Sequence, residues 1–128
     1  MGNEHINEGV HVHNVAAVAT ISFAHPKHNC FPQAQLKALT DAIDTCAQDD
    51  TVRVILLQSD PTKAFCAGAS FDELLAVQTP QQGKRFFMGF ANLINAMRLC
   101  SKPIVGRIHG KAIGGGVGIV AACDYAIA

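Results

Sequence analysis

A cluster of glycines near the end of the chain constrains the fold more than any other feature of the sequence. Gly114, Gly115 and Gly116 come shortly after an apolar run at residues 103–108 and lead into a second apolar segment. This pattern predicts a buried strand, a tight junction and a buried helix that begins at the glycines. The first backbone N–H groups of such a helix have no partner within it and point outward.

A second junction of the same kind lies upstream. Residues 64–70 read AFCAGAS and stand between an apolar run at 52–58 and a short helical turn that Ser70 can cap. Two such junctions facing each other would form an oxyanion hole, and small residues are needed because a side chain would block the approaching carbonyl. Taken singly, each motif is equally consistent with a tight loop or a close helix contact.

The periodicity elsewhere predicts strands that alternate with helices, an α/β fold with parallel and mixed strands. Strand-like residues at 10–13 and 15–23 predict a hairpin that turns near Asn14. The run at 52–58 is typical of a strand buried on both faces, and 103–108 is a further buried strand. The predicted helices cover 32–48, 81–99 and 115–123. The predicted core stripe of the second helix consists of Phe86, Phe87, Phe90, Leu93, Ile94 and Met97.

Length and composition favour a single domain over the 128 residues. Ten basic residues balance ten acidic ones without a block of like charge, which argues against nucleic acid as a partner. The first residues lack the basic and apolar regions of a leader, and a run of about 18 apolar residues that could span a membrane is missing. The five cysteines form no C-x-x-C pair, so we expect reduced thiols in a cytoplasmic protein.

Several segments taken together resemble the crotonase (enoyl-CoA hydratase/isomerase) superfamily in order and spacing. They are PKHNC at 26–30, KAFCAGA at 63–69, KPIV at 102–105, HGKAIGGG at 109–116 and CD at 123–124. The resemblance begins near Val12, and the AFCAGA and HGKAIGGG pair is its most specific part. It implies a spiral of ββα units, here truncated before the C-terminal helical part, so that residues 1–128 form the N-terminal part of one acyl-CoA-binding domain.

The resemblance also assigns roles by position. It makes the backbone N–H groups of Ala69 and Gly115 the two donors to a thioester oxygen. It places Lys27 near the nucleotide phosphates of coenzyme A, although a solvated loop lysine is nearly as good an interpretation. The other implied substrate-binding positions are Cys30, Cys66, Ala67, Gly68, Ser70, Phe71, Asp72 and Gly114. Coenzyme A enters as part of the substrate, so we expect no separate cofactor and no metal.

Gly118 is the main departure from the family pattern. In hydratases of this family the third residue after the middle glycine is a catalytic glutamate, whereas glycine has no group for acid–base catalysis. The second family glutamate lies beyond Ala128. We therefore expect a protein that is not a two-glutamate hydratase, which leaves a one-carboxylate isomerase, a decarboxylase or an atypical hydratase open. The position of Gly118 should be an apolar or water-filled gap bounded by neighbours such as Cys66 and Ala69.

Other features support weaker hypotheses. Asp72 and Glu73 follow the first donor loop, but acids in the first turn of a helix are the simpler interpretation. The GxGxxA pattern at 116–121 matches the letters of a dinucleotide fingerprint without a strand running directly into it or an acid about 20 residues later. Histidines that could hold a metal are His5, His11, His13 and His109, although polar strand positions are more typical of such residues.

Two functions remain open from the sequence. The first is an enzyme of fatty acid metabolism that stabilises a thioester enolate and catalyses hydration, dehydration or double-bond isomerisation, with a base beyond Ala128. The second is a non-catalytic fragment or pseudoenzyme that binds acyl-CoA or assembles with partners. In either case the expected ligand is an acyl-CoA or acyl-pantetheine thioester. An apolar edge at residues 125–128 predicts a homo-oligomer, which the resemblance implies to be a trimer or hexamer.

Overall fold

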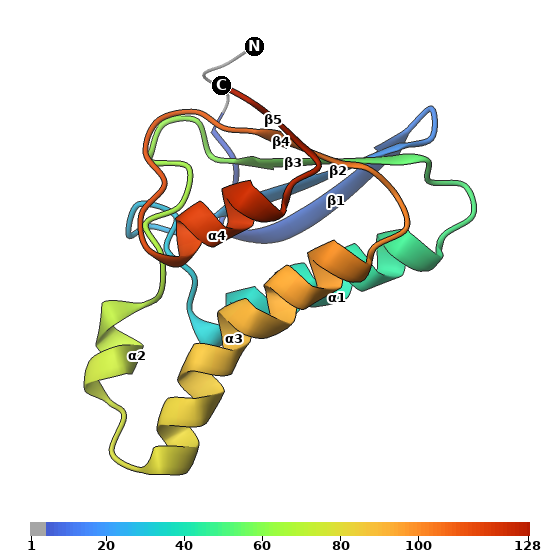
Figure 1. Cartoon of the computed structure of the whole chain (residues 1–128). Coiled ribbons are helices and arrows are strands. Elements are labelled where there is room, and N and C mark those ends of the chain that lie inside the picture. The colour runs from blue at the N-terminus through green and yellow to red at the C-terminus, as the bar shows by residue number, and fades with distance from the viewer. Residues whose placement is uncertain (1–4) are drawn as a thin grey trace.

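A computed structural model describes residues 5–128, which form one five-stranded sheet with all helices on one of its faces (Figure 1). The strand order is β1-β2-β3-β4-β5; β1 is antiparallel to β2, and all later pairs are parallel. The strands are β1 (Gly9–Val15), β2 (Val18–Ala24), β3 (Val54–Ser59), β4 (Ile104–Arg107) and β5 (Tyr125–Ile127). The helices are α1 (Gln33–Gln48), α2 (Phe71–Leu75), α3 (Pro80–Leu99) and α4 (Gly115–Ala122). The predicted α/β class, the mixed sheet and the three longer helices are confirmed.

The hairpin turns at a different place from the one predicted. Val15 pairs with Val18, so the turn consists of Ala16 and Ala17, not residues near Asn14. Both alanines have positive φ, 50° and 68°. A two-residue hairpin turn needs this conformation to match the twist of its strands, and it normally selects asparagine or glycine. Alanine is not typical of such turns, so the prediction placed the turn near Asn14, and this was wrong.

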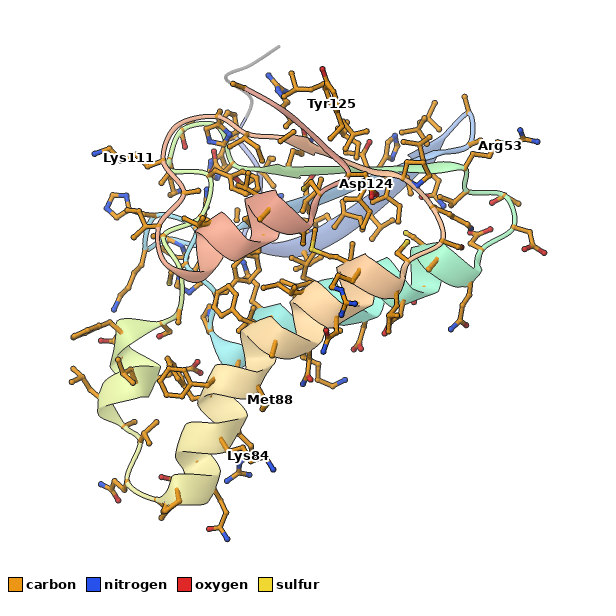
Figure 2. All side chains as sticks on the ribbon, in the orientation of Figure 1. Arg53, Lys84, Met88, Lys111, Asp124 and Tyr125 are labelled. Atoms are coloured by element: carbon orange, nitrogen blue, oxygen red, sulfur yellow. The ribbon has the colours of Figure 1, made fainter. Side chains whose placement is uncertain are left out.

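The two faces of the sheet differ in burial. The fully buried inner positions are Ala19, Ile21, Phe23, Ile55, Leu57 and Ile104. On the outer face, alternate residues of β3 are only partly buried, while Tyr125 and Ile127 are 67% and 49% exposed. Figure 2 shows Tyr125 on the side of the sheet away from the helices. The expectation that β3 is buried on both faces is therefore wrong for the described residues, because no described element covers the outer face.

The core stripe of α3 is also narrower than predicted. Phe86, Leu93 and Met97 are buried, and Phe90 and Ile94 are partly buried. Phe87 is 68% exposed, because consecutive residues on a helix point about 100° apart and cannot both face the core. None of the described helices is both long and apolar enough to cross a bilayer.

Side chains from other parts of the chain stabilise both ends of α1. Its N-cap residue Pro32 makes no side-chain cap, and the Gln33 N–H instead donates to the Glu73 carboxylate from α2 at 2.7 Å. At the other end the Lys102 ammonium donates to the carbonyl oxygens of Cys46, at 2.8 Å, and of Asp49. The position of α1 is thus tied to α2 and to the loop that precedes β4.

The carboxyl ends of β2, β3 and β4 lie at the same edge of the sheet because these strands are parallel. Three loops leave this edge, at residues 25–32, 60–70 and 108–114, and Figure 1 shows them gathered at the left of the molecule. In open α/β sheets, ligands bind outside the carboxyl ends of the strands. This edge is therefore where a ligand site is expected.

Candidate functional site

The two glycine-containing loops contact each other along their backbones. Cys66 and Ala112 form an isolated parallel β-bridge, with Cys66 N–H donating to Lys111 O at 3.3 Å and Ile113 N–H donating to Cys66 O at 3.0 Å. The His109 ring nitrogen Nε2 also lies 2.8 Å from the carbonyl oxygen of Lys63. The junctions that the sequence predicted are therefore side by side.

Glycine at position 68 is required by this contact. Gly68 has φ of +89°, a conformation that residues with a side chain rarely adopt. A Cβ at this position would lie 2.9 Å from Ile113 O and 3.6 Å from Gly115 N. The absence of a side chain thus allows the first loop to approach the start of α4 and brings position 68 close to the predicted donor nitrogen of Gly115.

The backbone N–H groups of Ala69 and Gly115 have no hydrogen-bond partner among the described residues. Both residues are partly exposed. By contrast, the next two N–H groups of α4 are used, because Gly116 donates to Ile113 O at 2.9 Å and Val117 donates to Gly114 O at 3.0 Å. Each loop therefore carries one unused N–H donor, and an oxyanion hole requires two such donors directed at one oxygen.

The third loop at this edge is built around Asn29. Its side-chain oxygen accepts from His25 N–H at 2.9 Å, and its amide donates to the carbonyl oxygens of Asp60 and Ala64 at 3.2 and 2.8 Å. Asn29 is fully buried and, like His28, has positive φ. Phe31 N–H then donates to Gly68 O at 2.7 Å, and Phe31 bridges to Ala69. Asn29 belongs to the PKHNC motif, but nothing in the sequence indicated that its side chain holds this loop against the first donor loop.

Lys27 lies in this loop and is paired with Asp72 in an ion pair between exposed side chains. The hydrogen bond and the charge of Asp72 raise the pKa of Lys27 above its ordinary value. Asp72 and Glu73 occupy the first turn of α2, and Ser70 caps that helix by accepting from Glu73 N–H at 3.3 Å, as the sequence predicted. Phe71 follows the cap and is 69% exposed.

Cys66 and Cys30 are buried thiols beside these loops. Burial raises the pKa of Cys66 to about 12, and its sulfur accepts from Gly68 N–H at 3.4 Å. Burial likewise raises the pKa of Cys30, whose sulfur lies 3.4 Å from His25 Nδ1. Both cysteines therefore remain protonated at neutral pH and fill space next to the donors. All five cysteines are free thiols.

Gly118 lies in a different environment from the one predicted. A Cβ at Gly118 would meet Ile94 of α3, with Cδ1 at 2.8 Å, and the residue whose Cβ would meet Cys66 is Gly116. The expectation that Cys66 and Ala69 border Gly118 is wrong, because α4 turns this position toward α3. The space is apolar, as expected, but the Ile94 side chain occupies it.

The structure does not support a metal site at the histidines that the sequence suggested. His5 Nδ1 lies 3.0 Å from the Asp60 carboxylate, and His11 Nε2 lies 3.0 Å from the carbonyl oxygens of Asn7 and Glu8. Within residues 5–128, His, Cys, Asp and Glu side chains form no group of three or more with the geometry to hold a metal ion. A surface groove of about 500 Å³ lies between α1 and α3, away from the donor loops.

The sequence profile of the enoyl-CoA hydratase/isomerase family matches residues 13–128. The chain belongs to this family. It is 30% identical over 113 residues to the 6-oxocyclohex-1-ene-1-carbonyl-CoA hydrolase of Geobacter metallireducens, covering 86% of this chain and 30% of the relative. It is 32% identical over 100 residues to the mitochondrial methylglutaconyl-CoA hydratase of Mus musculus, covering 78% of this chain and 32% of the relative.

Solved structures of the enoyl-CoA hydratase/isomerase family have the same fold. The enoyl-CoA hydratase of Mycobacterium smegmatis superposes with a TM-score of 0.86 at 30% identity, covering 94% of this chain and 47% of that one. The predicted crotonase-like fold is confirmed. The chain spans less than half the length of these relatives.

Proposed function

We propose that the protein binds an acyl-coenzyme A thioester and polarises its carbonyl through the N–H groups of Ala69 and Gly115, thereby stabilising an enolate. The observation that supports this most directly is the pair of unused donors on two loops that are hydrogen-bonded to each other. Donors fixed in this way stabilise charge that develops in the transition state, and losing one costs about 10²–10³ in rate in other enzymes.

The same proposal covers the reaction and the rest of the ligand. Hydration, dehydration or double-bond isomerisation would each use the enolate, with an acid or base supplied by another residue than Gly118. Lys27 and the loop containing Cys30 would face the coenzyme A portion, and Ala67, Gly68, Ser70, Phe71, Asp72 and Gly114 would line the approach to the donors. Coenzyme A would enter with the substrate, without a separate cofactor.

The test compares two ligands that differ only at the carbonyl. An arylacryloyl-CoA thioester has a conjugated chromophore whose absorption moves to longer wavelength when its carbonyl oxygen accepts hydrogen bonds. The matched control is the corresponding S-(3-arylallyl)-CoA thioether, in which a methylene group replaces the carbonyl. We expect a red shift on binding and about tenfold tighter binding of the thioester than of the thioether. Equal affinities without a red shift would overturn the proposal.

A non-catalytic acyl-CoA-binding protein is the second candidate, because glycine replaces the family glutamate at position 118. Family membership favours the enzyme, since the relatives are named as hydratases, isomerases and a hydrolase. A bound thioester with a red shift that is not turned over by the intact protein would favour the binding protein.

Assembly, location and pathway belong to the same proposal. We propose a homo-oligomer, a trimer or hexamer, which would cover the outer face of the sheet. A cytoplasmic location is supported by the five free thiols. We also propose a role in fatty acid metabolism, for which the acyl-CoA thioester chemistry is the only support.

A further inference from the structure

We propose that Phe90 is a positioning residue that fixes the Gly115 donor and sets its spacing from the Ala69 donor. This inference rests on the proposed function, because it concerns the same pair of N–H groups. Phe90 belongs to α3, a helix that contributes neither of the two donors.

The Phe90 ring lies directly against Gly115. A Cβ at Gly115 would be 2.5–2.7 Å from three carbon atoms of this ring, closer than any real contact. The α-carbon of Gly115 therefore rests on the ring face or edge without a side chain between them. Since the donor N–H is attached to this α-carbon, a shift of the ring changes the position of the donor.

The same ring also contacts the residue that holds the other donor loop. Phe90 packs edge-to-face on Phe31, with ring centroids 6.2 Å apart and planes at 84°. The Phe31 backbone donates to Gly68 O and bridges to Ala69. The contact between Phe90 and Phe31 therefore connects the Gly115 donor to the loop that carries the Ala69 donor.

Buried aromatic rings keep Phe31 from moving. Phe31 packs on Phe23 at 4.7 Å between centroids, and Phe23 packs edge-to-face on Phe65 at 5.5 Å. Phe65 belongs to the first donor loop, and all three rings are at most 1% exposed. Interiors of this kind are close-packed and shift little, so Phe90 rests on a rigid support.

The packing of α3 against its neighbours fixes the register of the Phe90 ring. Ile94, four residues after Phe90, fills the space left by Gly118, three residues after Gly115. On the α1 side, a Cβ at Gly89 would lie 2.8 Å from Leu36 Cδ1, so α3 approaches α1 closely next to Phe90. Because α3 interlocks with α4 on one side and with α1 on the other, it cannot slide along its axis, and the Phe90 ring stays at one position.

The experiment measures the red shift of arylacryloyl-CoA and the affinity for free coenzyme A in the intact protein and three variants. Phe90→Leu removes the flat ring and Phe90→Tyr keeps it. Phe87→Leu is the matched control, because Phe87 is an exposed phenylalanine on the same helix. We expect Phe90→Leu to lose most of the red shift and about tenfold in thioester affinity, with unchanged coenzyme A affinity. We expect Phe90→Tyr and Phe87→Leu to keep the red shift and the thioester affinity.

Two results would overturn the inference. The first is a Phe90→Leu variant with the full red shift. The second is a parallel loss of red shift and coenzyme A affinity in Phe90→Leu, which indicates general disruption of the site instead of a displaced donor. A protein without any red shift before substitution refutes the proposed function itself, so the two failures are distinguishable.

Discussion

Gly115 and Gly118 both face α3, but the atoms opposite them respond differently to an added methyl group. Gly115→Ala would bring its Cβ within 2.5–2.7 Å of the Phe90 ring, which is supported by Phe31. We expect this overpacking to lower the free energy of unfolding by about 1–3 kcal/mol. Gly118→Ala meets only the terminal methyl group of Ile94, which can rotate away, and gains helix propensity, so we expect a change below about 1 kcal/mol. Urea denaturation measures both, and a larger loss for Gly118→Ala contradicts the prediction.

A glutamate at position 118 tests the vacated acid–base position. The sequence alone predicts that Gly118→Glu in a full-length parent protein gives or raises crotonyl-CoA hydration, because acid–base catalysis is typically worth about 10²–10⁴ in rate. The structure adds that Ile94 occupies the space next to this position. We therefore expect the double variant Gly118→Glu/Ile94→Ala to hydrate faster than Gly118→Glu, with Ile94→Ala as the control. Hydration that is already fast and is slowed by Gly118→Glu would contradict the assignment.

Asp60 should contribute to stability in a pH-dependent way. Burial alone would raise its pKa, but hydrogen bonds from Thr62 and Lys63 outweigh burial and lower the pKa to about 2. Because the pKa is lower in the folded protein than in the unfolded chain, the stabilisation is complete above about pH 4 and is lost as the pH falls through about 2. This stabilisation contributes about 2 kcal/mol to the free energy of unfolding at neutral pH.

The corresponding variant is Asp60→Asn. It should have a lower free energy of unfolding than the unsubstituted protein at pH 7, and the difference should shrink between about pH 4 and pH 2. Asp50→Asn, at an exposed site, is the control. A difference between the two proteins that stays constant over this range would contradict the prediction.

At the scale of elements, α1 depends on side chains outside it. We expect Glu73→Ala, which leaves the Gln33 N–H without its acceptor, to lower the free energy of unfolding by about 1 kcal/mol. Lys102→Met removes the donor to the last carbonyls of the helix and should cost about 1–2 kcal/mol. Asp44→Ala, exposed on the same helix, is the control for both. Equal thermal stability of all three variants would show that the helix does not need these caps.

The elements that the sequence predicted well are those with strong periodicity. The apolar residues of α1 recur at helical spacing, and Leu36, Leu39, Ile43 and Cys46 are indeed buried. The hairpin was misplaced because the alanine turn is held in its unusual conformation by strand pairing and not by residue preference. Local sequence also gives no information on which distant residue meets a glycine, so the contacts of Gly115 with Phe90 and of Gly118 with Ile94 could not be foreseen.

At the scale of the whole molecule, the outer face of the sheet should lead to self-association. Parallel sheets are normally covered on both faces, and here Tyr125 and Ile127 are largely exposed. Light scattering should therefore detect an oligomer at micromolar concentration. Tyr125→Lys should shift it toward the monomer, whereas Leu99→Lys, a change at an exposed leucine of α3, should not. A clean monomer of the unsubstituted protein contradicts this prediction.

The parallel register of the sheet has a consequence for the order of folding events. Only the paired strands β1 and β2 are close in sequence. In the pairing of β3 with β4, Ile55 lies opposite Ile104, and a long segment of chain separates the two residues. Pairings between distant segments form slowly, because a large loop must close before any contact is gained. The first donor loop leaves β3 and the second leaves β4, so the two donors come together only after this late pairing. In a refolding experiment, the ability to polarise a thioester would appear last, after the hairpin and the helices.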